Sequence, residues 1–207
     1  MKPYLLGIDI GTSACKVAVF EKSGTVVAAA NGDYPVYYPK EGWAEQNPEE
    51  WWSAVCQAVK KVIEKAGIQP EEIAGIGIDG QSWSAIAMDK DGNVLTNTPI
   101  WMDTRAQSIC DRLNEEIGAD KIFEVSGNSL QPSYTTAKIL WYKENLPEVY
   151  AKIDKILQSN SYIAYKLTGV MSQDVSQGYG LHCFDMRKAD WDEEMCKKLG
   201  IPMGFLP

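Results

Sequence analysis

The sequence predicts an α/β fold in which helices cover a β-sheet. Three apolar, β-branched segments stand close together at the start of the chain, an amphipathic helix follows them, and another apolar strand follows that helix. The rest of the chain has mostly helical patterns. No linker, repeat or low-complexity segment divides the 207 residues, so we expect one continuous domain over residues 1–207.

Composition narrows the class of protein. Hydrophobic residues make up 45% of the chain and charged residues 23%, which is typical of a globular protein. The net charge of −8 argues against non-specific binding to nucleic acid or to an anionic membrane. The chain shows neither a signal peptide nor an apolar stretch of membrane-spanning length, so we expect a cytoplasmic protein. Five cysteines and one histidine lack metal-ligand spacing, so we expect buried free thiols.

The first three strands are predicted at residues 4–10, 15–21 and 25–31. Only three or four residues join one strand to the next. Connections of that length allow antiparallel hairpins and exclude parallel crossovers.

The clearest helix start lies after a polar loop. Asn47 is a good N-cap, Pro48 occupies the first helical position, and Glu50 is placed to complete a capping box. Trp51 belongs to the apolar stripe, which predicts that it packs in the core, and Gly67 ends the helix.

The later elements follow from apolar patterns and turn residues. A strand at 73–79 comes after the helix, so it should run parallel to the first strand through a right-handed crossover. Residues 86–95 read as a hairpin, and a helix should begin at Thr104. We expect a short strand near 156–157 and further helices at 134–145, 147–153, 159–168 and 192–199.

A candidate phosphate site follows the first strand. Asp9 ends that strand, and the small residues Gly11, Thr12 and Ser13 form a turn whose backbone N–H groups can cradle a phosphate. Asp9 would act through Mg²⁺, which binds few carboxylates and keeps its waters. Lys16 is a candidate cation. The alternative for the turn is an ordinary β-hairpin in which the aspartate occurs by chance. The alternative for Lys16 is an exposed lysine on a strand. The segment is not a Walker A loop.

Six segments along the chain carry a resemblance. They read GIDIGTS at 7–13, WAEQNPEEWW at 43–52, GIDGQ at 77–81, WMDTR at 101–105, TAKILW at 136–141 and YKLTG at 165–169. Through these motifs, in this order and approximate spacing, the chain resembles the N-terminal domain of the FGGY carbohydrate kinases. Among these kinases, its overall sequence most resembles the xylulokinases.

The resemblance implies a fold, a reaction and roles for the phosphate residues. The fold is the actin-like ATPase or ribonuclease H-like one, a mixed sheet with three antiparallel first strands, flanked by helices. The reaction transfers the γ-phosphoryl group of ATP to a sugar hydroxyl and needs Mg²⁺. Asp9 matches the family's catalytic and metal-organising acid, Gly11, Thr12 and Ser13 match its phosphate turn, and Lys16 occupies the place of a cation facing the phosphates.

The resemblance also marks a sugar side. Gln81, Ser82 and Trp83 match a substrate loop of the family, and Trp101 with Asp103 forms a second candidate pair. For the neighbouring Arg105 we expect either a pair with Asp103 or a cap on the following helix, and no direct contact with the sugar. An amide, a hydroxyl, a carboxylate and indole faces suit a polyhydroxylated ligand. The alternative for both tryptophans is core packing.

The acceptor implied is a ketopentose such as xylulose. Xylulokinases, however, commonly carry methionine and histidine where this chain has Ser82 and Trp83. Other ketopentoses, gluconate and polyols therefore remain open, because such a change is large enough to alter specificity.

The family's general-base aspartate and its adenine pocket have no match in these residues. The resemblance therefore implies that the C-terminal nucleotide-binding domain is absent and is the partner of this chain, which should be inactive alone. An apolar face left without that domain would favour a homodimer. The alternatives are a non-catalytic actin-like module that binds a sugar or a partner protein, and an ATPase of the same fold that acts on no sugar.

Overall fold

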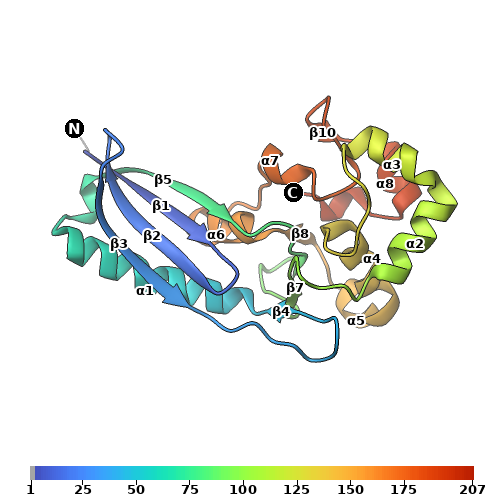
Figure 1. Ribbon diagram of the computed structural model, residues 1–207, viewed down its shortest axis with the longest axis horizontal. Coiled ribbons are helices and arrows are strands. Elements are labelled where there is room, and N and C mark those ends of the chain that lie inside the picture. The colour runs from blue at the N-terminus through green and yellow to red at the C-terminus, as the bar shows by residue number, and fades with distance from the viewer. Residues whose placement is uncertain (1–2) are drawn as a thin grey trace.

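A four-stranded mixed sheet forms one end of the molecule (Figure 1). The computed structural model describes residues 3–207, so the first two residues of the predicted domain lie outside the described part. The strands are β1 (Tyr4–Ile10), β2 (Ala14–Glu21), β3 (Val26–Asp33) and β5 (Ile73–Gly80), in the order β3-β2-β1-β5. The first three are antiparallel and β5 runs parallel to β1, as predicted.

Helix α1 (Pro48–Ala66) begins and ends where its capping residues predict. The side chain of Asn47 accepts a hydrogen bond from the backbone N–H of Glu49, and Gly67 adopts φ 64° after the last turn. The predicted capping box is wrong. The Glu50 carboxylate accepts a hydrogen bond from the hydroxyl of Tyr37 instead, because the preceding loop folds back over the first turn of the helix.

One face of the sheet is covered and the other is open. Helices α1 and α6 (Ser159–Thr168) pack on the covered face, where Trp51 is fully buried among apolar strand residues. The other face has two hollows of about 440 and 660 Å³, which Leu5, Phe20 and Val26 help to line. The predicted fold class is confirmed, with helices on one face of the sheet within residues 3–207.

The other end of the molecule is mostly helical (Figure 1). The predicted helix at Thr104 begins at Gln107 instead, because the Thr104 side chain bonds to the carbonyl of Gly42. The hairpin at 86–95 forms only one β-bridge, between Met88 and Val94. The helices and turns are η1 (Pro70–Glu72), α2 (Gln107–Leu113), η2 (Asn114–Gly118), α3 (Ala119–Ser126), α4 (Thr135–Asn145), α5 (Pro147–Tyr150), α7 (Val175–Gly178), α8 (Glu193–Leu199) and η3 (Met203–Phe205).

Three two-stranded ribbons complete the structure. They are β4 (Glu45–Gln46) with β7 (Thr98–Pro99), β6 (Ile86–Met88) with β8 (Lys155–Leu157), and β9 (Phe184–Asp185) with β10 (Asp190–Trp191). The β6–β8 ribbon lies between two hydrophobic cores. Residues 85 and 87 belong to the helical core, and residues 86 and 88 to the core under the sheet.

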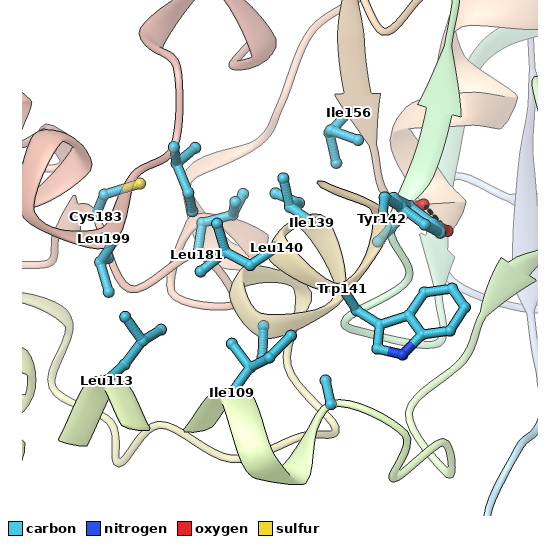
Figure 2. Packing of buried hydrophobic residues seen from close by; sticks show 14 of the residues in the cluster. Ile109, Leu113, Ile139, Leu140, Trp141, Tyr142, Ile156, Leu181, Cys183 and Leu199 are labelled. Carbon is cyan, nitrogen blue, oxygen red and sulfur yellow. Dashed lines mark hydrogen bonds between the residues drawn. The ribbon is translucent and has the colours of Figure 1, made fainter. Parts of the chain in front are cut away.

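Helix α4 forms the centre of the helical core. Figure 2 shows its Ile139 and Leu140 packed between α2, which contributes Ile109, and the C-terminal part of the chain, which contributes Leu181 and Leu199. Four of the five cysteines are buried and Cys56 is half-buried, and all five are free thiols. No helix within residues 3–207 has the length and apolarity to cross a membrane.

Candidate active site

The turn between β1 and β2 is held in place through its backbone carbonyls. Those of residues 10–13 accept hydrogen bonds from donors outside the turn, which belong to Gln81, Tyr34 and Gln46. Among residues 3–207, the N–H groups at positions 12 and 13 have no acceptor. With its carbonyls engaged and these N–H groups free, the turn can bind an anion.

Two donors to this turn were missed by sequence reasoning. Burial raises the pKa of Tyr34 well above its usual value, so the phenol keeps its proton and donates to the carbonyl of Gly11 at 2.6 Å. Gln46 is fully buried, and its Nε2 donates to the carbonyls of Thr12 (2.7 Å) and Pro35 (3.1 Å). Their roles depend on long-range contacts, and the only local signal was the place of Gln46 in the segment WAEQNP.

Asp9 lies at the end of β1 with its side chain 47% exposed. It faces Lys16 on β2, with 3.8 Å between the carboxylate Oδ2 and the ammonium Nζ. On its other side, the parallel register places Asp79 of β5 beside it. A solvent-accessible carboxylate next to an open anion site provides a hard oxygen ligand suited to Mg²⁺.

A hollow of about 500 Å³ brings most of the predicted site together. Its lining residues come from the turn after β1, from the end of β5 and the loop that follows it, and from the loop after β7. They are Asp9, Gly11, Thr12, Gly80, Gln81, Ser82, Trp83 and Trp101. The predicted phosphate and sugar residues therefore share one cavity, with the exceptions of Ser13, Lys16 and Asp103.

The two tryptophans of this hollow differ in their surroundings. Trp101 is 42% exposed, and its indole Nε1 donates to the hydroxyl of Thr12 at 3.0 Å. Trp83 is half-buried and stacks on Tyr134, with 4.3 Å between ring centroids, while Tyr179 meets it edge-on. Trp101 is too exposed to be a core residue, whereas Trp83 packs in part against these rings, and its Nε1 is buried without a partner within residues 3–207.

Gln81 faces the phosphate turn as well as the hollow. Its Nε2 donates to Oε1 of Gln46 at 2.7 Å and to the carbonyl of Gly11 at 3.3 Å. Its backbone N–H donates to the carbonyl of Ile10. Its Oε1 is buried and has no partner within residues 3–207. Ser82 lines the hollow beside it.

Asp103 lies elsewhere, and this corrects the expectation that it accepts sugar hydroxyls. The side chain is fully buried, and its oxygens accept hydrogen bonds from the backbone N–H of Ala44 at 2.7 Å and from Arg105 at 2.8–3.0 Å. The guanidinium of Arg105 also pairs with Glu45 at 2.7 Å and lies over the ring of Trp43. Asp103 is therefore a structural partner of Arg105.

Comparison with known proteins identifies the family. The model for the N-terminal domain of the FGGY family of carbohydrate kinases matches residues 4–207. The chain belongs to the FGGY family. This assignment confirms the resemblance found in the sequence motifs, and it agrees with the mixed sheet and its strand order.

Relatives within the FGGY family act on different acceptors. The chain is 32% identical to a xylulose kinase of Bacillus subtilis over 204 residues, which are 99% of this chain and 41% of that protein. A gluconate kinase structure from Lactobacillus acidophilus matches with a TM-score of 0.91 and 30% identity, over 99% of this chain and 41% of that one. A Plasmodium falciparum glycerol kinase solved with ADP matches with a TM-score of 0.90 and 26% identity, over 99% and 42% of the two chains. This FGGY chain spans about two fifths of their length.

Proposed function

We propose that this chain supplies the phosphate turn and the sugar-binding wall of an ATP-dependent sugar kinase. The observation that carries the proposal is the shared hollow, in which Asp9, Gly11 and Thr12 meet the loop at 81–83 and Trp101. A phosphoryl donor and an acceptor must lie in one cavity for transfer to occur, because this reaction depends mainly on positioning and charge neutralisation.

Each part has a chemical task in this proposal. The free N–H groups at residues 12 and 13 bind phosphate oxygens, and Lys16 adds positive charge next to Asp9. Asp9 would hold Mg²⁺, and the ion would supply neutralisation of phosphate charge at this place. The indoles of Trp83 and Trp101 offer apolar faces to the C–H groups of the acceptor, and Ser82 offers a hydroxyl.

The acceptor we propose is a ketopentose such as xylulose. Support comes from the similarity to a xylulose kinase, while the similarities to gluconate and glycerol kinases make these compounds the natural competitors. Trp83 provides an apolar ring at the place where xylulokinases commonly carry histidine, so discrimination between acceptors should depend on this side chain.

Intrinsic fluorescence tests sugar binding directly. D-xylulose should change the tryptophan emission at millimolar concentrations, and ribulose, gluconate and glycerol form the comparison set. Trp83→Phe and Trp101→Phe should each reduce the response. Trp191→Phe is the matched control, because Trp191 packs on Phe184 away from the hollow. If no compound in the panel perturbs the spectrum, the proposed sugar wall is refuted for this chain.

A turnover assay tests the division of labour. With Mg²⁺, ATP and each sugar, the 207-residue chain should form no sugar phosphate, because we assign the adenine pocket and the general base to the C-terminal half of the family. The alternative of a non-catalytic module predicts that the chain does not bind tripolyphosphate in the presence of Mg²⁺. Sugar phosphorylation by this chain alone would contradict our assignment of the adenine pocket and the general base to the C-terminal half of the family.

A further inference from the structure

Lys138 is a fully buried cation in the first turns of α4. Its Nζ donates to three backbone carbonyls, those of Trp83 at 2.7 Å, Ile100 at 2.8 Å and Ser133 at 2.6 Å. An ammonium group has three N–H donors, and all three are used here. Within residues 3–207 these partners are neutral carbonyls, and no carboxylate forms an ion pair with Nζ.

The buried charge is unfavourable by itself. Removing an ammonium from water destabilises the folded state unless it is well hydrogen-bonded, and the N-terminal turns of a helix disfavour positive charge. Burial lowers the pKa of Lys138 to about 7, and the negative charge of Asp103, itself paired with Arg105, acts in the opposite direction. An apolar side chain would avoid this penalty, but it would leave the three carbonyls without the donors that Lys138 supplies.

The three carbonyls belong to three separate segments, and each segment carries an aromatic ring of the site. Trp83 contributes its own carbonyl, Ile100 directly precedes Trp101, and Ser133 directly precedes Tyr134. Trp83 and Trp101 line the hollow, and Tyr134 stacks on Trp83. One ammonium group therefore joins the backbone segments behind all three rings.

The other side-chain contacts of α4 with the segment after Trp83 do not join it to the segments of Trp101 and Tyr134. The hydroxyls of Thr135 and Tyr142 donate to the carbonyls at residues 84 and 85, which fixes only the segment after Trp83. Trp83 also has φ 69°, a left-handed conformation that a bulky residue adopts only when its surroundings hold it there.

We propose that Lys138 is a positioning residue, which sets Trp83 and Trp101 at a fixed separation through the backbone carbonyls of Trp83 and of Ile100, the residue before Trp101. That these rings bind sugar rests on the proposed function above. The positioning of the two rings by Lys138 does not depend on the proposed function, and it can be measured without any sugar.

Fluorine NMR on 5-fluorotryptophan protein tests the positioning. The signals of residues 83 and 101 are assigned from the Trp83→Phe and Trp101→Phe variants. In Lys138→Met with native circular dichroism, both signals should move or broaden, while those of Trp51 and Trp191 should stay in place. Lys143→Met is the control, because Lys143 is exposed on the same helix. Unchanged signals at 83 and 101, or equal changes at all four tryptophans, would overturn the proposal.

A measurement on the unmodified protein covers the case in which Lys138→Met does not fold. Nitrogen-15 NMR of the lysine side chains, recorded at a pH below the pKa of Lys138, should show one ammonium whose protons exchange slowly and couple to three carbonyl carbons. If every lysine ammonium exchanges at the rate of exposed groups, the three-carbonyl contact does not exist and the proposal fails.

Sugar titrations then separate the two proposals. For any sugar that the unmodified chain binds, Lys138→Met should raise the dissociation constant about tenfold or more, and Lys143→Met should leave it unchanged. An equal dissociation constant in Lys138→Met would contradict the role of Lys138 in binding. If the unmodified chain binds no sugar, the proposed function fails, while the fluorine signals still decide the positioning role.

Discussion

The indole of Trp101 donates a hydrogen bond to the hydroxyl of Thr12, at 3.0 Å between Nε1 and Oγ1. The two residues are 89 positions apart in the sequence. This contact joins the proposed phosphate turn to the proposed sugar wall.

A double-mutant cycle measures this contact. Trp101→Phe and Thr12→Val each remove one partner, and their coupling energy in urea unfolding should be about 0.5–1.5 kcal/mol. The pair of Trp191→Phe with Thr12→Val supplies the reference, since Trp191 lies outside the hollow. Strictly additive effects of Trp101→Phe and Thr12→Val would show that the bond contributes nothing to stability.

Gly11 should not tolerate a side chain. A Cβ there would lie 2.9 Å from the carbonyl oxygen of Ala14, which accepts the hydrogen bond that closes the turn. We expect Gly11→Ala to destabilise the chain by about 1–3 kcal/mol in urea unfolding. Gly204→Ala is the control, because nothing lies within 4 Å of a Cβ at that position. Equal stability of the two variants would refute the close approach.

Asp9 should govern the binding of a metal-bound phosphate chain. In calorimetric titrations with Mg²⁺ and tripolyphosphate, Asp9→Asn should weaken binding about tenfold or more, because the amide carries no negative charge for Mg²⁺. Asp120→Asn, at an exposed acid in the first turn of α3, should behave like the unmodified chain. Retained affinity in Asp9→Asn would remove this residue from the proposed metal site.

Arg105 should be essential for stability. Arg105→Met leaves the fully buried Asp103 without its cation, which typically destabilises a protein by about 3–5 kcal/mol. Arg112→Met is the comparison, because Arg112 pairs with Glu144 at the surface and such pairs contribute about 0–1 kcal/mol. Similar melting temperatures for the two variants would contradict the structural role of Asp103.

The single histidine provides a pH probe. Burial lowers the pKa of His182 from 6.5 to about 4 in the folded chain. Between pH 6.5 and pH 4 the unfolded chain binds a proton at this histidine that the folded chain does not bind. The contribution of neutral His182 to the free energy of unfolding is therefore complete above pH 6.5 and is lost as the pH falls towards 4. It amounts to about 3 kcal/mol at most. NMR of the labelled imidazole should give a midpoint near 4, and His182→Gln should flatten the stability profile. A midpoint near 6.5 would refute the buried neutral state.

Local signals were sufficient for the sheet and for α1. Short connections made the first three strands antiparallel, and the caps at Asn47 and Gly67 set the ends of the helix. The start of α2 was misplaced by three residues, because the Thr104 side chain bonds to the carbonyl of Gly42 in a distant loop. Such long-range partners leave no trace in periodicity.

The site was predicted in outline and its supports were not. Motif residues Asp9, Gly11, Thr12, 81–83 and Trp101 do meet around one hollow, whereas Ser13 does not line it. Asp103 was misassigned because a carboxylate next to a tryptophan looks the same in sequence whether it faces a ligand or an arginine. A signal for Lys138 was present, since it is the only charged residue in the segment 135–142, whose residues are all buried. Its three carbonyl partners could come only from the fold.

The β6–β8 ribbon has a mechanical consequence. Residues 85 and 87 pack in the helical core, and residues 86 and 88 pack in the core under the sheet. Unfolding of either core therefore removes packing contacts from the other. Hydrogen-exchange rates in the sheet and in α4 should therefore rise at the same denaturant concentration, as in a single cooperative unit.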